Sequence, residues 1–504
     1  MSRRLLINSL SGTALYAVNI VAAFIMSPVI IRALGNRDYG LWELVMSVIG
    51  YMGLLDMGIG PALVRFVAVA DGRQDRNELQ QTMSTSFAFF IVVGLCATIM
   101  FLMLGYRPAL VAGTEGGNIA HIGIVFVLLG INAGMAFPLQ VFIATLMGVQ
   151  WHSFINGVRM VLVIIRSAAA WYLLSVYAGR GLIVMAILEP IFTALQLVLF
   201  AGAVHFSKAL PPLTVAAVTM HKAKEMIVFG VKSATMLVAS RLQNQSVPLI
   251  IGNTIGLGSI VYFVMPNRLT DYAKGLSQAV GFPLTPYFGA AIGKGDHDGL
   301  LSSWIHTTLV LQIISLAMSV TIVFCGEDFL RLWLGREYAV AGRMVLYILI
   351  AGLVADSLAT NAFRMLTAQG QHGGCAMIWL VLSAISIPVG IWGAHVWGVA
   401  GVAAGVTAVT VLANGITMYS ACSVMGISLA AYFKKTVLRI LLPLLIMAAV
   451  FAVCKYTISV VTYYYLVLSV TVSVACYLCS IWLVTLTAAD RNYVLSYIKL
   501  KLIS

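Results

Sequence analysis

The side chains best suited to chemistry in this sequence are ionisable residues that interrupt long apolar stretches. They are Asp56, Arg65, Arg166, Glu189, Lys232, Arg241, Arg268, Asp271, Lys274, Asp356 and Arg364. A charge at the centre of a membrane helix costs roughly 2.5–3.5 kcal/mol on insertion scales, so such residues usually face a protein interior or a water-filled cavity. We therefore treat them as the candidate functional residues, and the seven bases among them, including Arg65 and Arg166, as candidate substrate-binding residues.

These charges are unevenly distributed. In the first half two bases balance two acids, whereas in the second half Asp271 and Asp356 face five bases: Lys232, Arg241, Arg268, Lys274 and Arg364. Arg268, Asp271 and Lys274 are spaced three residues apart and share one helical face. Guanidinium groups match phosphate oxygens in pairs, and lysine supplies a mobile point charge. The excess predicts a wet, cationic cavity that binds a phosphate-bearing head group.

Several of these residues also have a structural interpretation. Arg268 and Asp271 could form a buried ion pair, and Arg166 could pair with an acid elsewhere. By contrast, Lys232 and Arg241 have no acidic neighbour on their own helix, which favours a functional role.

The same two interpretations apply near helix ends and chain breaks. Arg65 and Arg364 could extend from helix ends toward the membrane interface. Asp56 could cap the break expected at 58–61. Membrane-buried carboxylates can also exchange protons, and the candidates for ion coupling are Asp56, Glu189, Asp271 and Asp356.

The elements that position these residues must be solvated mainly by lipid. The chain has 504 residues, of which 61% are hydrophobic and 9% charged, with a mean hydropathy of +0.99; soluble domains carry about 25% charged residues. Lipid cannot satisfy loose backbone groups, and the apolar runs do not alternate as barrel strands do. The expected fold is an all-α polytopic bundle of about fourteen transmembrane helices, at 9–31, 40–69, 82–105, 119–147, 156–177, 181–205, 225–251, 259–289, 302–325, 340–368, 374–395, 398–422, 437–457 and 461–487.

Basic residues in alternate connections predict the orientation. Thirteen, among them Arg73 and Lys222, lie on the side of both termini, and eight, among them Arg331 and Lys455, lie on the other, so both termini are expected in the cytoplasm. No cleavage site follows the first apolar segment, which we expect to be retained as a span. The net charge of +13 is therefore interpreted as a topology signal, with no nucleic-acid partner.

Similar segments recur about 220 residues apart: 28–35 with 248–258, 147–152 with 368–372, and 179–182 with 397–401. Three matches in one order predict two six-helix copies in parallel orientation. The predicted domains are an N-lobe of helices 1–6 (1–207), a cytoplasmic linker (208–224), a C-lobe of helices 7–12 (225–424), and helices 13–14 with a cytoplasmic tail (425–504).

One part of the sequence resembles a known family. The stretch Leu34–Trp42, followed by Leu55–Gly60 and Ala62–Arg65, is similar to the start of helix 2 in Wzx-type polysaccharide and O-antigen flippases of the multidrug/oligosaccharidyl-lipid/polysaccharide exporter superfamily. The six-plus-six layout with two added helices also fits. The resemblance implies two lobes with alternating access.

The resemblance further implies translocation of undecaprenyl-pyrophosphate-linked repeat units across the bacterial inner membrane for surface polysaccharide synthesis. It implies a proton or sodium gradient in place of a cofactor, and no metal. The expected partners are the lipid-linked saccharide and membrane lipids, with a polysaccharide polymerase and glycosyltransferases acting beside it.

Two other functions are weighed against this one. A cation-coupled multidrug exporter predicts an acidic cavity and often an acid in helix 1, yet no ionisable residue lies between Arg4 and Arg32. Lipid II flippases place arginines in that helix. A membrane glycosyltransferase or polymerase predicts a large outer loop, but the longest, 326–343, is short. No P-loop motif is present, so we expect a transporter and not an enzyme.

Overall fold

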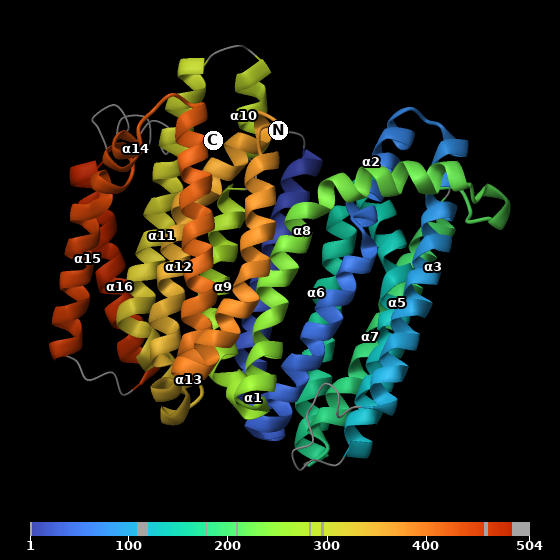
Figure 1. The fold of residues 1–504 in the computed structure, drawn as a ribbon, viewed down its shortest axis with the longest axis horizontal. Helices are drawn as coiled ribbons and strands as arrows, with labels where there is room; N and C mark the ends of the chain where they lie inside the picture. The colour runs from blue at the N-terminus through green and yellow to red at the C-terminus, as the bar shows by residue number, and fades with distance from the viewer. Residues whose placement is uncertain are drawn as a thin grey trace. The chain divides into compact units, whose positions relative to one another are not determined.

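The computed structural model describes residues 3–107, 119–177, 179–207, 210–281, 284–293, 297–457 and 462–485. Within these ranges the regular structure is helical and contains no strand, as predicted. The chain divides into two compact units, Met1–Val261 (unit 1) and Tyr262–Ser504 (unit 2). Figure 1 labels the helices of both units.

The helices of each unit follow one another along the chain. Unit 1 contains α1 (Arg3–Met52), η1 (Gly53–Asp56), α2 (Ile59–Gly72), α3 (Arg76–Tyr106), α5 (Ile119–Gly148), α6 (His152–Val176), α7 (Gly181–Phe206), η2 (Val215–Ala217), α8 (Met220–Thr254) and η3 (Leu257–Ser259). Unit 2 contains nearly all of α9 (Ile260–Gly281), then α10 (Leu284–Gly293), α11 (His297–Trp333), α12 (Arg336–Ala368), α13 (Gly373–Val424), α14 (Leu429–Lys435), α15 (Val437–Thr457), α16 (Tyr463–Ser480) and η4 (Ile481–Thr485).

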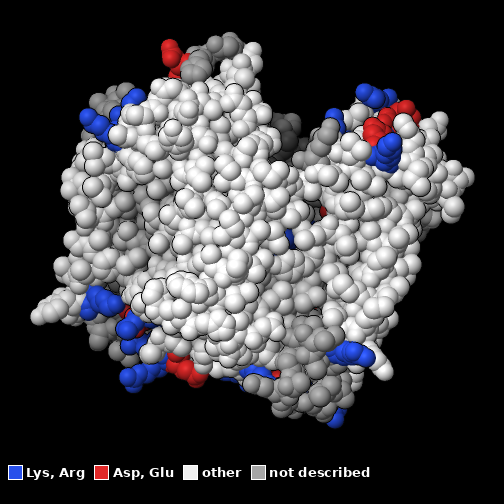
Figure 2. All heavy atoms as spheres, viewed as in Figure 1, with Lys and Arg blue, Asp and Glu red and all other residues white. Residues whose placement is uncertain are grey.

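The predicted membrane segments coincide with these helices. Among the described residues, 10 helices are long and apolar enough to cross a membrane. Two of them contain a break and so supply two predicted segments each: α1 is broken at Gly35, and α13 at Trp397 and Gly398. The more polar α8 covers the predicted segment 225–251, whereas the predicted segment 259–289 is shared between α9 and the start of α10. On the face drawn in Figure 2, most charged side chains gather near the ends of the helices, and few are visible in the band between them.

The break in the second predicted segment has a local cause. Met57 and Gly58 adopt left-handed backbone angles (φ 49° and 74°), which end η1 before α2 begins. A Cβ atom on Gly58 would lie 2.5 Å from the carbonyl oxygen of Gly230, so both the angle and the close approach require glycine. The Asp56 carboxylate accepts a hydrogen bond from the backbone N–H of Gly60 at 2.8 Å, which confirms the capping role considered for it.

Three turns recur with similar geometry in the segments that the sequence pairs. Gln150 and Gly370 both have positive φ (63° and 72°) and lie 220 residues apart. Each follows the same hydrogen-bond pattern, with Gln150 N–H donating to the Met147 carbonyl and Gly370 N–H to the Thr367 carbonyl. Positive φ also recurs in two further pairs, Gly35 with Gly256 and Gly179 with Gly398. This similarity supports the predicted repeat, whose domain boundaries stay a prediction.

Helix α8 packs within unit 1, whereas the repeat assigns it to the second copy. Figure 1 shows its first part crossing the ends of α2 and α3 before the helix bends along the bundle. The first part is held by Thr219, whose backbone N–H donates to Thr85 Oγ1 at 3.2 Å. Lys222 is 6% exposed and donates to the carboxylates of Glu78 and Glu225 at 2.9 and 3.0 Å. Units defined by packing thus divide after α8, at Val261 and not in the linker.

Basic residues that the predicted topology places on the same side of the membrane form ion pairs with the same acidic residue. In unit 1, Arg73 and Lys222, both assigned to the cytoplasmic side, form ion pairs with Glu78. In unit 2, Arg331 and Lys455, both assigned to the outer side, form ion pairs with Asp328. Which side faces the cytoplasm stays a prediction.

The core of unit 2 fixes the helices that carry its charged residues. Trp304 stacks on Tyr432 with ring centroids 5.1 Å apart. The Tyr432 hydroxyl donates to the Leu358 carbonyl at 2.8 Å, and the Tyr477 hydroxyl donates to the Ile313 carbonyl at 2.9 Å. The C-terminal helices α14 and α16 are thereby anchored to α12 and α11.

Candidate functional site

Two predicted substrate-binding arginines in unit 1 are engaged by the protein itself. Arg166 on α6 forms an ion pair with Glu189 on α7, which confirms the pairing considered for it. Arg65 on α2 lies over two aromatic rings, 4.5 Å from the centroid of Phe229 and 5.7 Å from that of Phe66. Cation–π contacts of this kind hold a guanidinium group in place without an acid.

The polar residues of α8 from Arg241 to Ser246 have two different surroundings. Gln245 packs on Gly50, where an added Cβ would lie 2.3 Å from the Gln245 side chain, and Ser246 is hydrogen-bonded to the Tyr51 hydroxyl. These residues therefore join α8 to α1. Arg241, one turn earlier, faces a cavity instead.

That cavity has a volume of about 390 Å³ and lies within unit 1. Asp56 and Arg241 line it together, from η1 and α8. The Arg241 guanidinium lies beside Gly53, where an added Cβ would be 3.3 Å from Nη2. Because the carboxylate and the guanidinium have opposite charge, their sum in this cavity is zero. Arg241 therefore belongs to a balanced site, whereas the sequence assigned it to the cationic excess.

The charged residues of α9 lie in unit 2. The Asp271 carboxylate accepts a hydrogen bond from Asn267 Nδ2 at 2.7 Å. Arg268, three residues earlier, has partners of its own. Lys274, one turn further on, lines a small pocket of about 20 Å³. The predicted series on α9 therefore extends into a pocket through Lys274.

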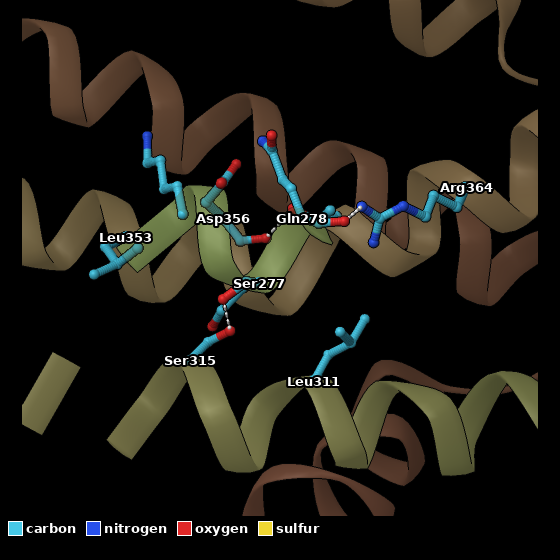
Figure 3. A pocket seen from close by; sticks show the side chains of 10 residues that line it. Ser277, Gln278, Leu311, Ser315, Leu353, Asp356 and Arg364 are labelled. Carbon is cyan, nitrogen blue, oxygen red and sulfur yellow. Dashed lines mark hydrogen bonds between the residues drawn. The ribbon is translucent and has the colours of Figure 1, made fainter. Parts of the chain in front are cut away.

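This pocket brings together three charged candidates from two helices. Lys274 comes from α9, and Asp356 and Arg364 come from α12. Figure 3 shows Asp356 and Arg364 on either side of Gln278, with Ser277 and Ser315 below. The Ser277 and Ser315 hydroxyls are 2.7 Å apart. A volume near 20 Å³ accommodates about one water-sized group.

The polar groups of the pocket are incompletely satisfied by the protein. Arg364 Nη2 donates to the Gln278 carbonyl at 3.4 Å, while Arg364 Nη1 is buried without a hydrogen-bond partner. Within the described part of the chain, Lys274 and the Asp356 carboxylate form no ion pair. Two cations and one carboxylate line the pocket. Asp271, which interacts with Lys274 and Asp356, and Arg268 add one charge of each sign, so the formal charge stays at +1 and an anionic group would complete the site electrostatically.

The structure leaves one predicted residue untested and adds one residue that the sequence analysis did not name. Lys232 lies on α8, but its side chain is outside the described residues. Arg159 on α6 was missed, although it is seven residues before Arg166 and so lies on the same helical face. Its position inside the predicted segment 156–177 was the signal that could have identified it.

Lys222 lies outside the predicted membrane segments, and two opposing effects shift the pKa of its ammonium group. Burial lowers the pKa of its ammonium group, but the hydrogen bonds and charges of Glu78 and Glu225 outweigh burial and raise the pKa above its ordinary value of 10.5. Lys222 Nζ also lies 4.5 Å from the Phe66 ring centroid. We assign this cluster to fixing α8 across α2 and α3.

Among the described residues, 10 helices are long and apolar enough to cross a membrane, and ionisable side chains line polar pockets between helices, an arrangement that membrane transporters use. The fold is similar to that of the lipid II flippase MurJ in an inward closed conformation, with a TM-score of 0.72, 12% identity, and coverage of 95% of this chain and 98% of that chain. The chain belongs to the family described as polysaccharide biosynthesis protein, whose profile matches residues 5–291, more than half of the sequence. The profile of the MatE family matches residues 267–392.

Two relatives match most of the chain at low identity. An uncharacterized membrane protein, EpsK, from Bacillus subtilis is 22% identical over 76% of this chain and 76% of its own length. A putative O-antigen transporter from Shigella flexneri is 21% identical over 72% of this chain and 84% of its own length.

Proposed function

We propose that this protein is a flippase that moves undecaprenyl-pyrophosphate-linked oligosaccharide repeat units across the bacterial inner membrane for surface polysaccharide synthesis. Membership of the polysaccharide biosynthesis protein family supports this function. So does the likeness to a putative O-antigen transporter and to the fold of a lipid II flippase. The protein acts as a transporter and not as an enzyme.

The observation that carries the substrate assignment is the pocket in unit 2. Lys274 and Arg364 bring two positive charges against the single carboxylate of Asp356, and the Arg364 guanidinium retains a buried N–H without a partner. A pyrophosphate oxygen is a strong acceptor for such groups. Because the pocket itself is small, it would hold one phosphoryl oxygen or a water and not a whole head group. Arg268 lies two turns earlier on the helix that carries Lys274.

Ion coupling is proposed at Asp356. The other acidic candidates are already engaged: Glu189 by Arg166, Asp56 by Gly60 and Asp271 by Asn267. Among the described residues the Asp356 carboxylate has neither a hydrogen bond nor an ion pair. A proton or sodium ion bound there would remove the one negative charge of the pocket and strengthen its attraction for an anion.

A cation-coupled multidrug exporter is the second candidate, favoured by the MatE match over residues 267–392. The two functions differ in the charge of the substrate. Cells that lack the gene should accumulate lipid-linked repeat units in the inner leaflet, and the wild-type gene should restore their transfer to the outer leaflet. Charge reversal by Arg268→Glu should abolish this transfer without changing the amount of protein in the membrane. Extrusion of ethidium, with no change in the lipid-linked saccharide, would support the exporter instead.

The proposed partners follow from the substrate, and the proposed location follows from the distribution of basic residues. Its saccharide is assembled by glycosyltransferases and consumed by a polysaccharide polymerase, so these enzymes are proposed partners. The proposed location is the plasma membrane with both termini in the cytoplasm, because thirteen of the basic connection residues lie on that side.

A further inference from the structure

The cavity of unit 1 is a second polar site, separate in the chain from the pocket of unit 2. Its volume of about 390 Å³ lies within the range of roughly 300–1,000 Å³ that is typical of small-molecule sites. Its walls are largely apolar, and a few polar side chains interrupt them, including Asp56, Asn132, Gln140 and Arg241. Apolar walls with a few convergent polar groups are the usual composition of a ligand site.

Electrostatics distinguish the two sites. Asp56 and Arg241 cancel in unit 1, whereas Lys274, Asp356 and Arg364 leave a formal charge of +1 in unit 2. A pyrophosphate would gain from Arg241 but would be repelled by Asp56. A neutral ligand with both donors and acceptors would satisfy both groups, since hydroxyls can do either.

A buried amide points to the same conclusion independently. Asn132 on α5 lines the cavity and is 8% exposed, and its side-chain oxygen has no hydrogen-bond partner. Buried polar atoms are nearly always hydrogen-bonded, so an orphaned acceptor at a cavity wall calls for a donor from a ligand or a water. Arg241 forms no hydrogen bond or ion pair with the described residues. Its guanidinium group is therefore available as a donor.

The apolar walls fit one face of a sugar ring. Phe137 on α5 lines the cavity and is 8% exposed, and its ring stacks on the fully buried ring of Phe90 on α3, with centroids 6.2 Å apart. A pyranose presents C–H groups on its faces and hydroxyls around its edge. The faces pack on aromatic and apolar side chains, while the edge reaches carboxylate, amide and guanidinium groups.

We propose that the cavity of unit 1 binds one neutral, hydroxyl-rich sugar residue, through Asp56, Asn132, Gln140 and Arg241. This inference rests on the proposed function, because the sugar residue is taken from the saccharide of the proposed substrate.

The test uses two probes that separate the two parts of the substrate. The full-length protein in lipid nanodiscs is titrated with monoglucosyl diacylglycerol, a neutral glycolipid, and with undecaprenyl pyrophosphate, which has no sugar. Asn132→Leu keeps the side-chain size and removes the acceptor. It should weaken glycolipid binding about tenfold, which corresponds to about 1.4 kcal/mol, and leave pyrophosphate binding unchanged. Lys274→Gln should have the opposite pattern.

Controls keep loss of folding apart from loss of binding. Asn414→Leu is the matched control, because Asn414 is also a buried asparagine with an unpartnered side-chain atom but lies on α13 in unit 2. It should leave both affinities unchanged. Gln140→Leu replaces an exposed residue of the same cavity and should reproduce the selective loss if Asn132→Leu fails to fold.

The outcomes separate this inference from the proposed function. Unchanged glycolipid affinity in both cavity variants, or an equal loss for both probes, would overturn the sugar site. Failure of the wild-type protein to bind undecaprenyl pyrophosphate, with selective glycolipid binding intact, would count against the flippase alone.

Discussion

The ion pair between Arg166 and Glu189 gives a direct way to separate structural from substrate-binding arginines. Glu189→Gln leaves the guanidinium without its partner. Loss of one partner costs roughly 3–5 kcal/mol in a buried pair, and an exposed pair contributes roughly 0–1 kcal/mol. The two side chains are 36% and 14% exposed, so we expect a loss of about 2 kcal/mol, between these limits.

The full experiment is a double-mutant cycle. Arg166→Met should destabilise the protein by a similar amount, because it leaves the carboxylate unpaired. The double variant Arg166→Met/Glu189→Gln removes both charges and should recover most of the loss. Stability is measured as the fraction of detergent-solubilised protein that stays monodisperse after heating, and transport as the return of lipid-linked repeat units to the outer leaflet.

The two readouts together decide the role of Arg166. If Arg166 is structural, transport should fall in the two unstable single variants and should recover, together with stability, in the double variant. A double variant that is stable but does not transport would refute this reasoning and restore Arg166 to the substrate-binding set. A stable Glu189→Gln single variant would show that the pair contributes little.

Three further perturbations follow from the same structure. Gly58→Ala should destabilise unit 1 by about 1–3 kcal/mol because of the left-handed backbone angle, and the close contact with Gly230 should add to this loss. Gly72→Ala is the control, because an added Cβ there meets open space and should not destabilise the protein. Thermal unfolding of the two variants measures the difference. Gly281→Ala places a Cβ 2.0 Å from Arg364 Nη1, so it should displace this flexible group and weaken pyrophosphate binding as Arg364→Gln does, with no fall in expression; binding equal to wild type would contradict this. The raised pKa of Lys222 means that its contribution to stability is complete below pH 10.5 and is lost as the pH rises through the raised value, so an alkaline unfolding titration should lose this step in Lys222→Met.

Much of the fold was predictable because hydropathy and turn signals act locally. The segment near Gly58 was expected to break, and capping by Asp56 was one of the two roles considered for that residue. Both features follow from glycine, proline and carboxylate chemistry within a few residues. The breaks at Gly35 and Gly398 likewise separate segments that hydropathy had already divided. These features depend on short stretches of chain, which a sequence shows directly.

The site was less predictable because it depends on which helices pack together. A charge count along the chain placed Arg241 with the cationic excess, but packing places it beside Asp56, which is 185 positions earlier. The same count could not show that two phenylalanine rings hold Arg65. Nor could it show that Asn132 has an unpartnered oxygen at a cavity wall, because an asparagine in an apolar helix carries no charge signal.

The central claim is that this protein moves an anionic lipid-linked saccharide through contacts that include Lys274 and Arg364. The most direct measurement is the rate at which a labelled polyprenyl-pyrophosphate saccharide becomes accessible in the opposite leaflet of proteoliposomes. The wild-type protein should accelerate this step, and Lys274→Gln/Arg364→Gln should slow it at least about tenfold, since a hydrogen bond to a charged group contributes about 1.5–3 kcal/mol. Arg343→Gln, a change in an exposed residue of α12 that lines neither pocket, should leave the rate unchanged. Acceleration by the double variant equal to that of wild type would contradict the account.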